Sequence, residues 1–202
     1  MLGLSVAGRR CDRLLLVLYR HLASESAYRE FASTLAALSP SYVIDVGGGT
    51  GLLGRALRGL GWQGVYVLVD PDECLVGDAP EHPRSLRLEA RGEALPLPPL
   101  PGSVAVFHDA LHHMEEPEEA LREAARVAEC VAVKDFDVSG LSVKILKILE
   151  KLFGYPARFS TLTHVKEALE LLGFRVTTLT REPKGGFTLV ACKGGRRRHG
   201  SH

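Results

Sequence analysis

The chain has 202 residues, enough for one or two domains with a buried core, which excludes a peptide hormone or a wholly disordered tail. Hydrophobic residues make up 46% and charged residues 24%, as in ordinary globular proteins, so collagen-like, coiled-coil and disordered classes are excluded. Lys and Arg number 25 against 24 Asp and Glu, and this near-neutral balance disfavours nucleic acid as a partner.

Short β-branched runs alternate with helical patterns along the chain, which predicts a parallel sheet covered by helices. Helical patterns fill 11–38 in two pieces, and further helices are expected at 51–59, 117–127, 141–153 and 163–172. Strands are expected at 42–46, 64–69, 85–89, 104–107, 130–134, 174–179 and 186–192. The last two strands are separated by a segment too short for a parallel crossover, so they should form an antiparallel hairpin.

We expect a single domain over 1–193, with N-terminal helices in 1–40 and a basic disordered tail over 194–202. Apolar residues at helical spacing in 141–153 predict an amphipathic helix, and 137–162 could serve as a lid, a dimer contact or a plain packing helix. No apolar run reaches the length of a membrane span and no secretory pattern is seen, so we expect a cytoplasmic protein.

The four cysteines, Cys11, Cys74, Cys130 and Cys192, lie far apart in the sequence, which predicts reduced, mostly buried thiols rather than a zinc site or redox motif. The chain has no Asn and a single Gln, and this depletion of thermolabile amides hints at a hot source organism.

Glycines crowd the loop after the first predicted strand. Residues 45–51 read Asp-Val-Gly-Gly-Gly-Thr-Gly and precede a helical pattern. A loop without Cβ atoms lets backbone approach a ligand closely, and the start of the following helix offers free N–H groups. A tight turn needs only one glycine, so the loop predicts a bound ligand.

Asp70 ends the second predicted strand, 19 residues after Gly51, where its carboxylate can accept both hydroxyls of a ribose. Two nucleoside cofactors compete for such a site. Gly49, Gly51 and Gly54 satisfy the G-x-G-x-x-G pattern of dinucleotide binding. Asp45, however, would repel a pyrophosphate and could engage the ammonium of an amino-acid moiety, which favours S-adenosylmethionine.

Segment 45–51 resembles the first motif of class I S-adenosylmethionine-dependent methyltransferases, and Asp70 resembles the acidic residue of their second motif. Residues 93–98, 104–114 and 117–127 resemble the third and fourth motifs of the small branch acting largely on metabolites. Residues 167–174 resemble the last helix of that family as it enters the final hairpin.

This resemblance implies a Rossmann-like α/β three-layer sandwich, with a seven-stranded mixed sheet in the order 3-2-1-4-5-7-6 and the seventh strand antiparallel. It also implies S-adenosylmethionine as the cofactor. Its methionine part would lie at Gly47, Gly49 and Gly51, its ribose at Asp70, its adenine at Glu93 and Ala94, and its sulfonium region near His108. Many relatives place an Asp where this chain has Arg91, which cannot accept a hydrogen bond from adenine, so backbone groups near Gly92 should do so.

Methyl transfer from a sulfonium chiefly requires alignment of the reacting atoms, so a general base is optional. Asp109, His112 and His113 follow the fourth strand at the ligand edge of the sheet and are the candidate catalytic residues. The two histidines could instead be structural residues. No metal site is expected, because these residues lack a clear further ligand.

The sequence therefore predicts S-adenosylmethionine-dependent methyl transfer to an O, N or C nucleophile of a small metabolite. Two alternatives stay open: a non-catalytic nucleoside-binding module with the same fold, and a methyltransferase acting on RNA or protein. The expected partner is a small-molecule methyl acceptor, without a membrane or nucleic acid, and the expected state is a monomer or homodimer.

Overall fold

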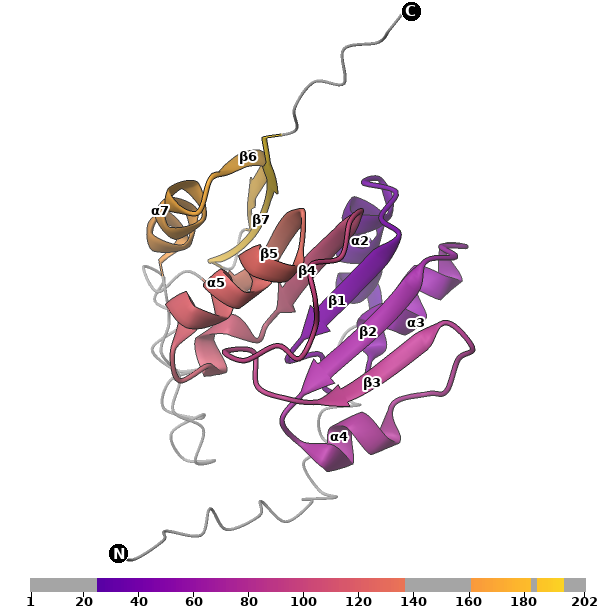
Figure 1. The fold of residues 1–202 in the computed structure, drawn as a ribbon. Coiled ribbons are helices and arrows are strands. Elements are labelled where there is room, and N and C mark those ends of the chain that lie inside the picture. Colours follow the sequence, from indigo (N-terminus) through magenta and orange to yellow (C-terminus); the bar gives the residue numbers. More distant parts are fainter. Residues whose placement is uncertain (1–24, 137–160, 183–184, 195–202) are drawn as a thin grey trace, which may run out of the picture.

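The computed structural model describes residues 25–136, 161–182 and 185–194 (Figure 1). The first N-terminal helical pattern, the amphipathic segment 141–153 and the basic tail beyond residue 194 lie outside these ranges. Within them, seven strands form one sheet in the order β3-β2-β1-β4-β5-β7-β6. The strands are β1 (Tyr42–Val46), β2 (Val65–Asp70), β3 (Ser85–Glu89), β4 (Ser103–His108), β5 (Cys130–Phe136), β6 (Phe174–Arg181) and β7 (Gly186–Lys193).

Strands β1 to β5 pair in parallel, and β7 runs antiparallel to both β5 and β6. The predicted strand order and hairpin are confirmed. The central strands β1 and β4 are buried along nearly their whole length, which explains their mostly apolar sequences. The carboxyl ends of the parallel strands meet at one edge, and this edge carries Asp70, His108 and Asp135.

Helices cover both faces of the sheet and make the three layers seen in Figure 1. Helices α2 (Glu25–Ala36) and α3 (Leu52–Gly59) bury Phe31 and Leu57 in one apolar cluster, while α5 (Pro117–Val127) and α7 (Leu162–Leu171) bury Leu121 and Leu169 in another. No helix in these described ranges is long and apolar enough to cross a membrane.

Two short elements were not expected: α4 (Glu73–Asp78), beside β2 and β3, and the 3-10 helix η1 (Leu111–His113) after β4. Helix α4 begins because the Asp72 carboxylate accepts hydrogen bonds from the backbone N–H groups of Cys74 at 2.9 Å and Leu75 at 3.3 Å. Elements this short carry too few residues to show a helical period, so sequence pattern alone does not find them.

Cys130 and Cys192 form a disulfide between β5 and β7, with their Cα atoms 4.0 Å apart. The expectation of four reduced thiols was therefore wrong for this pair. The two residues are 62 positions apart in sequence, and only the antiparallel register of the two strands places them directly opposite each other.

Candidate functional site

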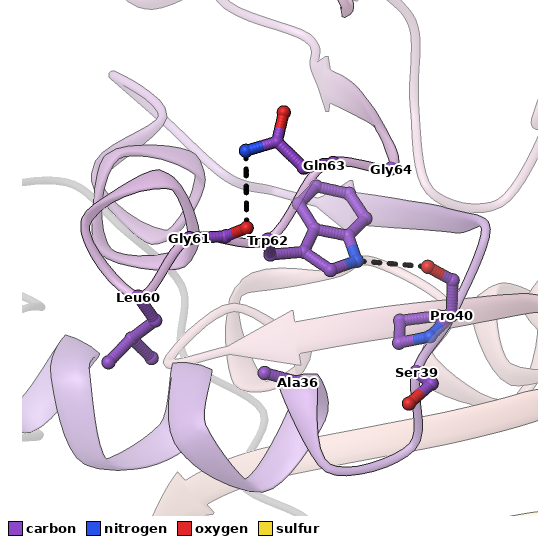
Figure 2. A pocket seen from close by; sticks show the side chains of 8 residues that line it. All are labelled: Ala36, Ser39, Pro40, Leu60, Gly61, Trp62, Gln63 and Gly64. Carbon is purple, nitrogen blue, oxygen red and sulfur yellow. Dashed lines mark hydrogen bonds between the residues drawn. The ribbon is translucent and has the colours of Figure 1, made fainter.

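An open pocket lies at the amino-terminal edge of the sheet, between the end of α2 and the turn before β2 (Figure 2). It is lined by Ala36, Ser39, Pro40, Leu60, Gly61, Trp62, Gln63 and Gly64. The indole N–H of Trp62 donates to the Pro40 carbonyl at 2.9 Å, and the Gln63 amide donates to the Gly61 carbonyl at 3.2 Å. None of the lining side chains titrates near neutral pH, so acid–base chemistry must be sought at the opposite edge.

The glycine loop leads from β1 into α3 at the carboxyl edge. Gly47, Gly49 and Gly51 have φ angles of 72°, 55° and 72°, a left-handed conformation that side chains strongly disfavour. The N–H of Gly47 donates to the Val69 carbonyl at 2.7 Å and so ties the loop to β2. Gly51 is the N-cap of α3, and its N-cap position makes no side-chain hydrogen bond. The N–H of Gly54 donates to the Tyr66 hydroxyl, whereas those of Leu52 and Leu53 have no side-chain cap.

The remaining glycine of the loop serves the protein's own packing. A Cβ added to Gly48 would lie 2.5 Å from the carboxyl carbon of Asp45 and 2.6 Å from a methyl of Leu68. Gly47 is also confined, because an added Cβ would lie 2.8 Å from that of Ala110. The glycine content of the loop thus has two causes: internal packing at Gly48, and the left-handed backbone at the predicted cofactor-binding glycines Gly47, Gly49 and Gly51.

Asp70 joins the loop to the end of β2. Its carboxylate accepts hydrogen bonds from the backbone N–H of Gly49 at 3.0 Å and of Asp72 at 2.9 Å. Burial raises the pKa of this carboxyl above its ordinary value, while the two hydrogen bonds oppose the rise. The structure therefore brings Asp70, the residue predicted to bind the ribose, into direct contact with the glycine loop.

Asp45 is 2% exposed, and its carboxylate accepts a hydrogen bond from the Tyr66 hydroxyl. The other carboxylate oxygen, Oδ1, is buried without a hydrogen-bond partner among the described residues. Burial raises the pKa of Asp45 to about 7, against the opposing hydrogen bond. Tyr66, which donates this hydrogen bond to Asp45, is a residue of the candidate site that sequence reasoning missed. It stands inside an apolar strand, where it resembles an ordinary core residue.

We expect Asp45→Asn to flatten the dependence of folding stability on pH. The folded-state pKa of about 7 exceeds the ordinary value of 3.8, so the folded protein holds this proton more tightly than the unfolded chain does. The resulting stabilisation is complete below pH 4 and is lost as pH rises through 7, by up to about 4 kcal/mol. Urea denaturation of both proteins from pH 4 to 8 measures this slope, and parallel curves would contradict the prediction.

His108 ends β4 and packs its ring against α2. Its ring centroid lies 4.2 Å from that of Tyr28 and 5.3 Å from that of Phe31. The side chain is 4% exposed, and neither ring nitrogen has a hydrogen-bond partner among the described residues. Burial, followed by the charge of Lys134, lowers the pKa of His108 to about 4, so the imidazole is neutral at pH 7.

The candidate catalytic residues lie just beyond His108. His112 is 3% exposed, and its Nδ1 atom lies 2.6 Å from Oδ1 of the buried Asp135. His113 is exposed, with its ring centroid 4.0 Å from that of His112. The Asp109 backbone has a φ of 51°, and its side chain is 39% exposed. Partial burial of the carboxyl, followed by the nearby charge of Asp135, raises the pKa of Asp109.

Sequence reasoning missed Asp135. It lies at the end of β5, so the rule that parallel strands end at one edge could have placed it beside His108. The predicted strand stopped one residue too early for that argument.

The predicted adenine segment lies against the end of β1. A Cβ on Gly92 would lie 2.9 Å from Val46, so its backbone packs directly on that strand. The Glu93 carboxylate accepts hydrogen bonds from the N–H groups of Glu115 at 2.9 Å and Glu116 at 3.3 Å, so it is committed to the loop. Arg91 forms an ion pair with Glu115 at 2.7 Å. These contacts leave backbone groups, rather than the Glu93 carboxylate, as candidates for adenine.

In the parts of the chain that the structure describes, no group of three or more His, Cys, Asp or Glu residues could hold a metal ion. The chemistry of the edge is that of three histidines, several carboxylates and backbone N–H groups.

Comparisons with known proteins agree with this arrangement. Residues 44–129 match the family model described as a methyltransferase domain. The search of curated proteins found no match.

Solved structures give the same fold at low sequence identity. Magnesium protoporphyrin IX methyltransferase from Synechocystis PCC 6803, with bound S-adenosylhomocysteine, is 18% identical over 84% of this chain and 83% of its own, with a TM-score of 0.66. A possible histamine N-methyltransferase from Thermotoga maritima is 19% identical over 90% and 96%, with a TM-score of 0.64. An S-adenosylmethionine-dependent methyltransferase from Aquifex aeolicus is 21% identical over 84% and 98%, with a TM-score of 0.59.

The residues at the carboxyl edge fit S-adenosylmethionine. Polar atoms of Asp45, Thr50 and His108 are buried there without hydrogen-bond partners among the described residues, which is costly unless a ligand supplies partners. The left-handed glycines and the uncapped start of α3 form a bare backbone cradle beside them. Residues 44–129 match a methyltransferase domain, solved S-adenosylmethionine-dependent methyltransferases share the fold, and the residues at the carboxyl edge fit S-adenosylmethionine as the cofactor.

Proposed function

We propose that this enzyme methylates an O, N or C nucleophile of a small metabolite. The cofactor supplies a methyl group already activated on a sulfonium sulfur, so the protein chiefly has to hold the two reactants in line. The remaining work falls to the chain's own side chains at the carboxyl edge of the sheet.

Each cofactor contact follows from the chemistry of the residue. The unpartnered oxygen of Asp45 suits the ammonium of the methionine part, and Gly47, Gly49 and Gly51 permit close backbone approach. The acidic Asp70 suits the ribose hydroxyls. Backbone groups of Glu93 and Ala94 are proposed to face adenine, consistent with the commitment of the Glu93 carboxylate to its own loop.

His108 is proposed to lie near the sulfonium region. A protonated histidine would repel this cation, whereas burial keeps His108 neutral at pH 7. The absence of hydrogen-bond partners for its ring nitrogens leaves both its donor and its acceptor for the bound reactants.

The burial of the polar groups beside the glycine loop is the observation that carries the proposal of a small acceptor. His108 is 5% exposed and His112 is 3% exposed, next to the candidate Asp109. A small molecule can reach such buried groups more readily than a duplex or a folded protein surface can. The near-neutral charge supports the same choice over RNA.

Two of the structurally similar proteins carry names that include small acceptors, namely magnesium protoporphyrin IX and histamine. These names support a small acceptor without specifying it. A non-catalytic binding module is no longer favoured, because the matched domain is that of an enzyme.

The test is to incubate the protein with S-adenosylmethionine labelled in its methyl group. A metabolite extract, total RNA and a protein extract are offered in separate reactions. We expect label to enter low-molecular-weight products of the metabolite reaction. Label in RNA or protein, with none in the metabolites, would overturn the proposal and favour a macromolecular acceptor.

The single domain over 1–193, a cytoplasmic location and a monomeric or homodimeric state are part of the same proposal. Size-exclusion chromatography with light scattering measures the oligomeric state directly.

A further inference from the structure

The carboxylate of Asp135 makes more contacts with His112 than a structural link requires. Its Oδ2 accepts a hydrogen bond from the backbone N–H of His112 at 3.2 Å, and its Oδ1 accepts one from the N–H of Phe136 at 2.7 Å. The first of these bonds already fastens η1 to the end of β5, and the second lies within β5. The additional contact, from the imidazole Nδ1 to Oδ1 at 2.6 Å, therefore concerns the ring itself.

This contact determines which nitrogen of His112 is basic. An ionised carboxylate only accepts hydrogen bonds, so Nδ1 must carry the proton that it donates to Asp135. In a neutral imidazole, Nε2 is then the nitrogen that can take up a further proton. Asp135 is 5% exposed, and little water competes for its carboxylate.

The location matches a role in the reaction. Both residues lie at the cofactor edge: Asp135 is among the last residues of β5, where Lys134 pairs with His108 on β4, and η1 begins three residues after His108. The other charged or titratable side chains around the pair, in the described ranges, include His108, Asp109, His113, Lys134 and Glu182. Lys134 forms an ion pair with Glu182 at 3.1 Å. The carboxylate bonded to His112 is that of Asp135.

We propose that Asp135 is a positioning residue that orients His112 as the general base for the methyl acceptor. The inference rests on the proposed function and adds an acceptor class to it: a nucleophile that must lose a proton, such as a hydroxyl or an ammonium. The acceptor atom forms a bond to the methyl carbon while the carbon–sulfur bond breaks and its electron pair stays on sulfur. The acceptor's proton passes to Nε2 of His112, and the imidazolium, stabilised by Asp135, later releases it to water.

The first test is independent of the acceptor. Long-range ¹H–¹⁵N NMR of the full chain with S-adenosylhomocysteine reports which ring nitrogen of His112 is protonated. We expect protonated Nδ1 and unprotonated Nε2 in the wild type, and loss of this preference in Asp135→Asn. A wild-type His112 protonated on Nε2 would overturn the proposal.

The second test separates catalysis from structure. In His112→Asn, the side-chain amide can still donate to Asp135 but cannot act as a base. We expect label transfer to the most active metabolite fraction to fall about 100-fold or more, with unchanged melting temperature and S-adenosylhomocysteine affinity. Transfer within about threefold of wild type would show that His112 is only structural.

Asp135→Asn should slow transfer about 10- to 100-fold and move the acid limb of the rate profile to lower pH, because the imidazolium loses its stabilising charge. Glu129→Gln is the matched control: it removes the same charge just before the opposite end of β5 and should leave the rate unchanged. An unshifted limb in Asp135→Asn would contradict the proposal. If wild type methylates no metabolite fraction, the proposed function fails, while the NMR result still decides the state of His112.

Discussion

Gly49→Val is expected to abolish measurable binding of S-adenosylmethionine while the protein remains folded. Gly49 has a φ of 55°, where a β-branched residue is a strong outlier, so valine would force the loop into another conformation. The same residue donates its N–H to Asp70 at 3.0 Å, and the new conformation would break that link as well. Isothermal titration calorimetry should show affinity at least about 100-fold weaker than wild type, or no heat of binding.

A matched glycine gives the control for this change. Gly77 lies in α4, and a Cβ added there meets no heavy atom within 4 Å. Gly77→Val should therefore bind the cofactor normally. Circular dichroism establishes that both variants are folded. Normal affinity in a folded Gly49→Val would mean that the loop does not hold the cofactor.

The strands were predictable because their short β-branched sequences differ sharply from the helical patterns and turns on either side. β1 and β3 have the expected bounds, and the short link before β7 is compatible only with a hairpin. The strand order, by contrast, came from the family resemblance. Local patterns cannot order parallel strands, because strands that lie side by side, such as β1 and β4, need not be consecutive in the sequence.

The candidate site was predictable where chemistry resides in a single residue or loop. The glycine loop and Asp70 lie together as expected, since the carboxyl ends of parallel strands share one edge. Pairs formed across strands were not predictable. Tyr66 with Asp45 and Asp135 with His112 are separated by 21 and 23 positions, and no sequence spacing indicates either contact. The Cys130–Cys192 disulfide was missed for the same reason.

Asp70→Ala should weaken binding of S-adenosylhomocysteine by about 2–4 kcal/mol, roughly 30- to 1,000-fold. The carboxylate has two functions: it is proposed to accept the ribose hydroxyls, and it accepts the Gly49 N–H at 3.0 Å. Alanine removes both, so the loss should exceed that of a single hydrogen bond. Glu89→Ala is the matched control, because Glu89 is an exposed carboxylate directly beside Asp70 in the β2–β3 register. Its affinity should be unchanged.

A ligand lacking the ribose 2′-hydroxyl separates the two functions of Asp70. If the carboxylate bonds that hydroxyl, wild type should bind the deoxy ligand more weakly than S-adenosylhomocysteine, whereas Asp70→Ala should bind the two nearly equally. If Asp70 only fastens the loop, the deoxy ligand should lose the same affinity with both proteins. Calorimetry with the two proteins and two ligands measures this coupling, and a value near zero would remove Asp70 from the ribose site while leaving its bond to Gly49 intact.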